Sequence, residues 1–220
     1  MFRVLTVSRE YGSGGAAIAR DVSERLGWQL LDKTLMLEIA RAAHVQPELV
    51  QRFDERVDSW VHRVSRTSLW HGAFEGVAAV TPEEFLDAET VAELACRLIE
   101  VAYERRNCVV VGRGAQCVLR GRADALHVFI YAPWPSRIAR VEQRLPAAKN
   151  VEELIRANDR QRAEYIRMHF GCNWSDPHLY DLLINSELGE DRAASLILDA
   201  LSYGPTPTAD RPQTIGNLSS

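Results

Sequence analysis

The chain of 220 residues carries 26 lysine and arginine residues against 30 aspartate and glutamate residues, a formal net charge of −4 at neutral pH. This balance argues against a general nucleic-acid-binding protein, because such proteins normally carry excess positive charge. The sequence has no apolar run of about 18 residues and no basic-then-apolar leader, so we expect a cytoplasmic protein without a membrane segment. The four cysteines lack C-x-x-C spacing and the six histidines form no i, i+4 pair, so neither a zinc site nor a disulfide framework is expected.

The first predicted element is a strand over residues 2–8, an apolar run rich in β-branched side chains. The glycines at 12, 14 and 15 then favour a tight turn, and apolar residues at helical spacing predict a helix over 16–26. A strand, a glycine turn and a helix in this order point backbone N–H groups and a helix N-terminus at a phosphate.

This glycine turn departs from the P-loop pattern G-x-x-x-x-G-K-[ST], in which the lysine reaches the β- and γ-phosphates and the hydroxyl binds Mg²⁺. With Gly14 in the last glycine position, Arg9 replaces the first glycine and Gly15 replaces the lysine. Ala16 replaces the hydroxyl residue, or Ala17 does if the register extends by one residue. The turn alone therefore leaves two interpretations open: a phosphate cradle or a plain strand-to-helix turn.

A second strand is predicted over residues 28–32, ending in Asp32. Open α/β sheets bind ligands at the carboxyl ends of their strands, so Asp32 is a candidate substrate residue; a helix cap is an equally good interpretation. Residues 33–104 are mostly helical in pattern and too long for one crossover helix. We expect a helical insertion over about 44–104, whose last helix begins at Pro82.

A third strand is predicted over residues 107–111, and Arg113 follows it between Gly112 and Gly114. A guanidinium at the carboxyl edge of the sheet is well placed for an anionic ligand. The alternative is a surface arginine in a turn.

The remaining strands are predicted over 126–131 and 180–185, with helices from about 133, over 151–169 and over 189–201. Five short apolar strands separated by helices imply an α/β fold with a parallel sheet and helices on both faces. We expect a single domain over 1–203 and a disordered tail over 204–220.

Arginine supplies nearly all of the positive charge, because only two of the 26 basic residues are lysines. Any phosphate clamp must therefore be built mainly from arginine. Each of two predicted helices carries several arginines on one face. Together these faces suggest a mobile helical lid over about 141–170, whose closure would bring the arginines to a phosphoryl group. These arginines are Arg137, Arg140 and Arg144 on the first helix and Arg156, Arg160 and Arg167 on the second. An exposed arginine face without a ligand is the simpler alternative.

Several motifs in one order resemble those of the cytidylate kinase-like family, a divergent branch of the P-loop nucleoside monophosphate kinases, over nearly the whole chain to about residue 202. The matching stretches are Ser8-Arg9-Glu10-Tyr11-Gly12-Ser13-Gly14-Gly15, Leu31-Asp32, Val111-Gly112-Arg113-Gly114, the helix segment 158–165 and the run Trp174-Ser175-Asp176-Pro177-His178-Leu179-Tyr180-Asp181-Leu182-Leu183-Ile184-Asn185.

The resemblance implies a P-loop NTPase-type sheet of five parallel strands and transfer of the γ-phosphoryl group of ATP, with Mg²⁺, to a nucleoside monophosphate such as CMP or dCMP. It implies three groups of site residues. Arg9, Gly12, Ser13, Gly14 and Gly15 would hold the ATP phosphates; Asp32 and Arg113 would contact the acceptor; and Arg113, Asp159, Arg160 and Arg162 would serve catalysis, the last three from the lid. The implied partners are nucleotides rather than a nucleic-acid polymer or a membrane; the metal ligands and a homo-oligomer stay open.

Two functional hypotheses follow. The first is an ATP-dependent nucleoside monophosphate kinase, or a kinase for another small acceptor; the second is a non-catalytic nucleotide-binding or regulatory protein with a degenerate P-loop. The missing lysine and hydroxyl favour the second. The charged residues that converge on the predicted sheet edge favour the first, since a pure scaffold has no need of them.

Overall fold

The computed structural model describes residues 1–32 and 82–204. Most of the predicted helical insertion, the helix start that Asp32 would cap and nearly all of the predicted tail lie outside these residues. No helix in the described ranges is long and apolar enough to cross a membrane.

The centre of the fold is a five-stranded sheet in the order β2-β3-β1-β4-β5, and every neighbouring pair is parallel. The strands are β1 (Val4–Arg9), β2 (Gln29–Leu31), β3 (Cys108–Val111), β4 (Ala125–Tyr131) and β5 (Leu182–Asn185). The prediction of five parallel strands is confirmed. The central strands are buried on both faces, which is why their sequences are continuous apolar runs rather than alternating ones.

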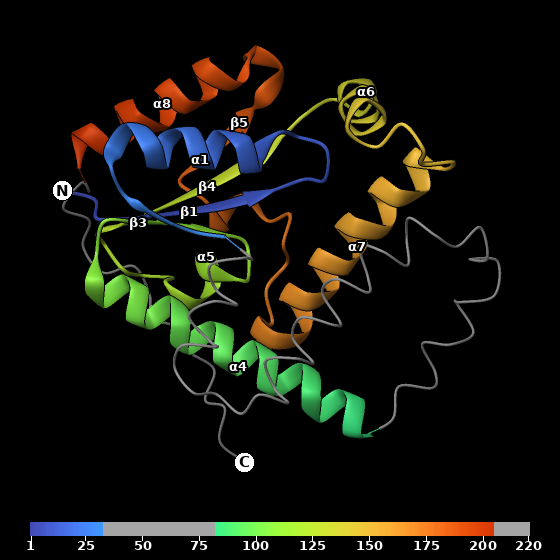
Figure 1. The fold of residues 1–220 in the computed structure, drawn as a ribbon. Helices are drawn as coiled ribbons and strands as arrows, with labels where there is room; N and C mark the ends of the chain where they lie inside the picture. Colours follow the sequence, from blue (N-terminus) through green and yellow to red (C-terminus); the bar gives the residue numbers. More distant parts are fainter. Residues whose placement is uncertain (33–81, 205–220) are drawn as a thin grey trace.

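Helices cover both faces of the sheet (Figure 1). On one face, α1 (Gly15–Leu26) and α8 (Glu190–Tyr203) pack against the strands through a core that includes Ile18, Val22 and Ile197. On the other, α4 (Pro82–Arg105) and the short α5 (Ala115–Val118) pack through a core that includes Ile99 and Leu119. The sequence did not predict α5, because one turn of helix is too short to show a hydrophobic period.

Two further helices, α6 (Trp134–Arg144) and α7 (Val151–Phe170), follow β4 and lie beside the sheet rather than on one of its faces (Figure 1). They pack together through Val141 and Ile155, and the far end of α7 packs through Ile166 on Phe129 of β4. Two short 3₁₀ helices, η2 (Pro177–Leu179) and η3 (Ser186–Leu188), flank β5.

Candidate active site

The carboxyl ends of the parallel strands bring the predicted polar residues to one edge of the sheet. Arg9 ends β1, Asp32 directly follows β2, and Arg113 lies two residues beyond β3. The backbone N–H of Gly112 donates to the carbonyl of Val7 at 3.0 Å, so the turn after β3 is still joined to β1. This edge is where open α/β sheets bind their ligands.

The loop between β1 and α1 is closed by its own hydrogen bonds. The N–H and hydroxyl of Ser13 both donate to the carbonyl of Glu10, at 3.3 and 2.9 Å. Gly12 and Gly14 have φ angles of +83° and +76°, a region that glycine enters without steric cost. Gly14 caps α1, and the N–H groups of the first turn of a helix have no partner within the helix. The loop therefore presents backbone donors at a helix N-terminus, which suits a phosphate.

The structure gives a reason for the missing P-loop lysine. Gly15 is buried, and a Cβ atom added there would lie 2.6 Å from the Cβ of Arg9 and 3.3 Å from the Cβ of Ile130. No side chain fits at Gly15 unless Arg9 moves. The Arg9 side chain instead crosses to the end of β3, where its Nη1 atom lies against the backbone of Gly112.

Two guanidinium groups, those of Arg113 and Arg162, act electrostatically on the guanidinium of Arg9. Burial and the charges of Arg162 and Arg113 lower the pKa of Arg9 to about 9, and the carboxylate of Asp32 opposes this. Burial also lowers the pKa of Arg113 and that of Arg162. All three are positively charged at neutral pH, and the two nearby carboxylates, those of Asp32 and Asp159, leave an excess of positive charge. Such a cluster is suited to an anion that carries more than one charge.

Arg113 is held in a strained turn. Its φ is +59°, and the flanking Gly112 and Gly114 both have φ of +76°. A left-handed conformation costs a residue with a side chain about 1–2 kcal/mol. Strain of this kind is concentrated at functional sites, where a side chain has to be aimed in a direction that regular structure does not allow.

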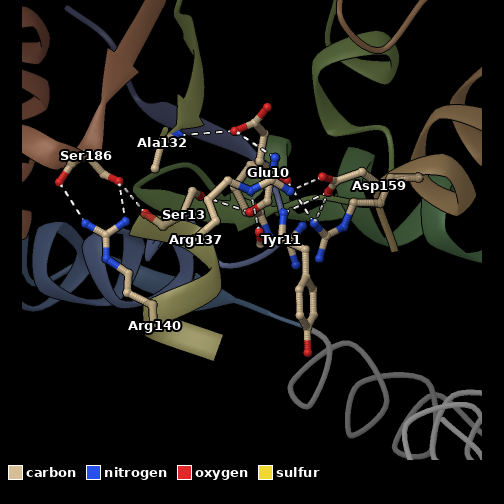
Figure 2. A network of polar contacts seen from close by, with 10 residues as sticks. Glu10, Tyr11, Ser13, Ala132, Arg137, Arg140, Asp159 and Ser186 are labelled. Carbon is tan, nitrogen blue, oxygen red and sulfur yellow. Dashed lines mark hydrogen bonds and ion pairs between the residues drawn. The ribbon is translucent and has the colours of Figure 1, made fainter. Parts of the chain in front are cut away.

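Arg137, on α6, fastens the glycine loop to the helices beside it (Figure 2). Its side chain is 7% exposed, and its Nε donates to the carbonyl of Tyr11 at 2.8 Å. Its two remaining nitrogens pair with carboxylates, Nη1 with Glu10 at 3.3 Å and Nη2 with Asp159. Glu10 also accepts a hydrogen bond from the N–H of Ala132 at 3.1 Å.

Side chains of α7 also form hydrogen bonds with the backbone of residues 9 and 11, at the start of the glycine loop. Asp159 accepts hydrogen bonds from the N–H of Tyr11 at 2.8 Å and from Arg162 at 3.3 Å, and Arg162 donates to the carbonyl of Arg9 at 3.0 Å. The structure therefore brings together Arg9, Arg162 and Asp159, three of the site residues that the family resemblance implies. Arg160 is exposed, and its charge is not one of those that act on Arg9.

The predicted arginine faces behave differently from the expectation. Arg137 is buried. Arg140, on the same helix, instead donates hydrogen bonds to the hydroxyl and the carbonyl of Ser186, both at 3.1 Å. The side chain of Arg156, on α7, is 61% exposed and pairs with Glu152. The face of α7 that meets the loop carries Asp159 and Arg162, not the arginine stripe.

The described residues do not provide a magnesium site made of protein ligands. α1 begins with Gly15, Ala16 and Ala17, so no hydroxyl stands where a P-loop has one. The Glu10 and Asp159 carboxylates are already paired with Arg137, and no group of three or more histidine, cysteine, aspartate or glutamate residues in the described ranges could hold a metal ion. Magnesium in kinase sites is held by one or two carboxylates and by phosphate oxygens, and this donor set does not fit an ion held by side chains alone.

Sequence reasoning missed the residues that support the loop: Glu10, Arg137 and Ser186, whose hydroxyl donates to the carbonyl of Ser13 at 2.6 Å (Figure 2). A weak signal existed for two of them. Glu10 lies inside the glycine motif, and Arg137 begins the arginine face of α6.

Sheet order and glycine loop together define the class: an α/β protein with the P-loop NTPase fold. Within that class, the chain belongs to the cytidylate kinase-like family, whose model matches residues 4–188. The resemblance predicted from the sequence is thereby confirmed.

A curated relative, the cytidylate kinase of Methanosarcina mazei, is 30% identical over 89 residues, which are 40% of this chain and 49% of that protein. The chain thus spans about half the length of the curated relatives it matches.

Among solved structures, an uncharacterized protein from Eubacterium ventriosum superposes with a TM-score of 0.65 at 20% identity, over 91% of this chain and 98% of that one. Shikimate kinase from Acinetobacter baumannii, solved with shikimate, gives a TM-score of 0.50 at 16% identity, over 92% of this chain and 94% of that one. At these identities the likeness shows the fold alone.

Proposed function

We propose that the protein transfers the γ-phosphoryl group of ATP to a nucleoside monophosphate, with CMP or dCMP as the first acceptors to test. The observation that carries the proposal is the cluster of Arg9, Arg113 and Arg162 beside the glycine loop. Phosphoryl transfer needs two phosphates aligned and the charge on the transferred group offset, and guanidinium groups do both.

In this proposal Arg9 supplies the cation that the lysine supplies in an ordinary P-loop. Support comes from the contact between Gly15 and Arg9, which leaves room for only one of the two side chains. Burial, together with the charges of Arg162 and Arg113, lowers the pKa of Arg9 to about 9, and a bound phosphate would offset the repulsion among these charges.

We assign roles to the other site residues from where each one lies at the carboxyl edge of the sheet. The glycine loop and the start of α1 would hold the ATP phosphates through backbone N–H groups. Arg113 and Asp32 would face the acceptor from the ends of β3 and β2, and Arg162 would offset charge on the transferred group from α7. Asp159 would orient Arg162, and Mg²⁺ would enter as the ATP complex.

The proposal is tested by ADP release from ATP–Mg²⁺ with a panel of nucleoside monophosphates. Arg113→Ala should raise the KM for the acceptor and leave the affinity for ATP nearly unchanged. Arg9→Met should lower kcat by a factor on the order of 10²–10³, the usual cost of removing one donor from a developing anion. Arg20→Ala, which removes an exposed arginine of α1, is the matched control and should change neither.

A non-catalytic nucleotide-binding protein is the second candidate, favoured by Gly15 and Ala16 in place of the lysine and hydroxyl. Calorimetric titration with ATP and CMP distinguishes the two. Binding of both nucleotides without turnover of any acceptor would support the second candidate and contradict the first.

A further inference from the structure

The last turns of α7 lie against the turn that carries Arg113. The ring of Phe170 occupies the space beside Gly114, where an added Cβ atom would lie 2.2 Å from a ring carbon. Tyr165 packs on Phe170 and His169, with ring centroids 6.0 and 4.7 Å apart. This packing holds Tyr165 close to Arg113, and each of the two acts electrostatically on the other.

One side of α7 therefore lies against both the glycine loop and the turn that carries Arg113. Asp159, Arg162 and Tyr165 are spaced three residues apart, which puts them on neighbouring positions of one side of the helix. Asp159 and Arg162 contact the glycine loop through Tyr11 and Arg9. Tyr165 lies one step further along, about 4.5 Å by the rise of an α-helix, on the side of Arg113.

The Tyr165 hydroxyl is buried and makes no hydrogen bond within the part of the chain that the structure describes. Tyr180, in the same apolar cluster, behaves in the usual way, because its hydroxyl donates to the carbonyl of Trp174 at 2.7 Å. A buried tyrosine hydroxyl normally has a partner, and leaving it without one costs free energy.

This hydroxyl is a donor at neutral pH. Burial raises the pKa of Tyr165 to about 12, although the positive charge of Arg113 acts in the opposite direction. A protonated hydroxyl and a guanidinium can both donate hydrogen bonds to the same anion, so the two side chains together suit a phosphate group.

We propose that Tyr165 is an acceptor-binding residue whose hydroxyl donates a hydrogen bond to the phosphate of a phosphorylated acceptor, beside Arg113. The inference rests on the proposed function and narrows it, because it requires an acceptor that carries a phosphate monoester rather than a neutral alcohol. Arg113 can take two phosphate oxygens and leaves the third for the hydroxyl.

The test is Tyr165→Phe, which keeps the ring against Phe170 and removes only the hydroxyl. We expect the KM and the Kd for CMP to rise about 10- to 150-fold, as for a lost hydrogen bond to a charged group. The KM for ATP should change less than twofold. The melting temperature should stay the same or rise, because a buried hydroxyl without a partner has been removed.

Tyr180→Phe is the matched control. It removes a buried hydroxyl that has a partner, so it should lower the melting temperature and leave the KM for CMP unchanged. A merely structural role for the Tyr165 hydroxyl predicts the same pattern for both variants.

Turnover tests the proposed phosphoryl transfer, whereas the Kd for CMP tests the role of Tyr165. Measuring both allows either proposal to be refuted without the other. If the wild type binds CMP but transfers no phosphoryl group, the proposed function fails and Tyr165 is judged by the Kd for CMP alone. An unchanged Kd in Tyr165→Phe, equal losses for ATP and CMP, or a wild type that binds neither CMP nor inorganic phosphate would each overturn the inference.

Discussion

Replacement of Arg137 by methionine removes the side chain that joins α6, α7 and the glycine loop. The change breaks the hydrogen bond to the carbonyl of Tyr11 at 2.8 Å and the ion pairs with Glu10 and Asp159. Methionine can fill most of the volume, so the loss is electrostatic rather than a cavity.

The expected cost can be worked out from the partners left behind. Removing one member of a buried ion pair costs about 3–5 kcal/mol, because a carboxylate stays buried without its partner. Asp159 keeps Arg162 and the N–H of Tyr11, and Glu10 keeps the N–H of Ala132. We therefore expect the free energy of unfolding to fall by about 3 kcal/mol, which is the lower end of that range. For a chain of this size that corresponds to a melting temperature lower by roughly 6–12 °C.

Urea unfolding followed by circular dichroism measures this change. Arg156→Met is the control, since Arg156 is 61% exposed and pairs with an exposed Glu152, a type of contact worth about 0.5 kcal/mol or less. Arg137→Lys keeps the charge but cannot contact three partners at once, so it should fall between the two. An Arg137→Met protein within about 1 kcal/mol of the wild type would refute the reasoning that this ion-pair network supports the loop.

Three further predictions concern the same region and the core. Gly15→Ala should weaken ATP binding at least about tenfold, because its Cβ would lie 2.6 Å from that of Arg9, whereas Gly27→Ala, with nothing within 4 Å, should leave ATP affinity intact even if it lowers stability. Cys108, whose thiol pKa burial raises to about 11, should resist iodoacetamide at pH 7.5 in the folded protein and react only after unfolding; rapid labelling of the native protein would contradict this. If residues 141–170 form a lid, ATP and CMP together should slow their cleavage by trypsin, and an unchanged cleavage rate would argue against closure.

Much of the fold could be predicted from the sequence because the local signals agree with one another. The strand that ends at Val111 is a short apolar run closed by glycine, and such a run is typical of a strand covered on both faces. The helix predicted to begin at Pro82 begins there. The positions of Asp32 and Arg113 at the sheet edge follow from strand ends alone, since parallel strands end on the same side.

The sequence by itself determined which residues share a face, but the tertiary structure decided which face turns inward. Arg137 and Arg156 both belonged to predicted arginine faces, yet the side chain of Arg137 is 7% exposed and that of Arg156 is 61% exposed. Helical periodicity gives angles between residues on one helix, whereas burial depends on the neighbouring helix that packs against it.

The sequence and the tertiary structure also contribute differently to the account of the glycine loop. The sequence showed that Gly15 stands where a lysine is expected, but it could not show why. That reason is a distance between two residues on different elements, because the Cβ of Arg9 occupies the space that a side chain at Gly15 would need. A contact of this kind depends on how closely β1 approaches α1, which is decided by packing across the sheet and not by the local sequence.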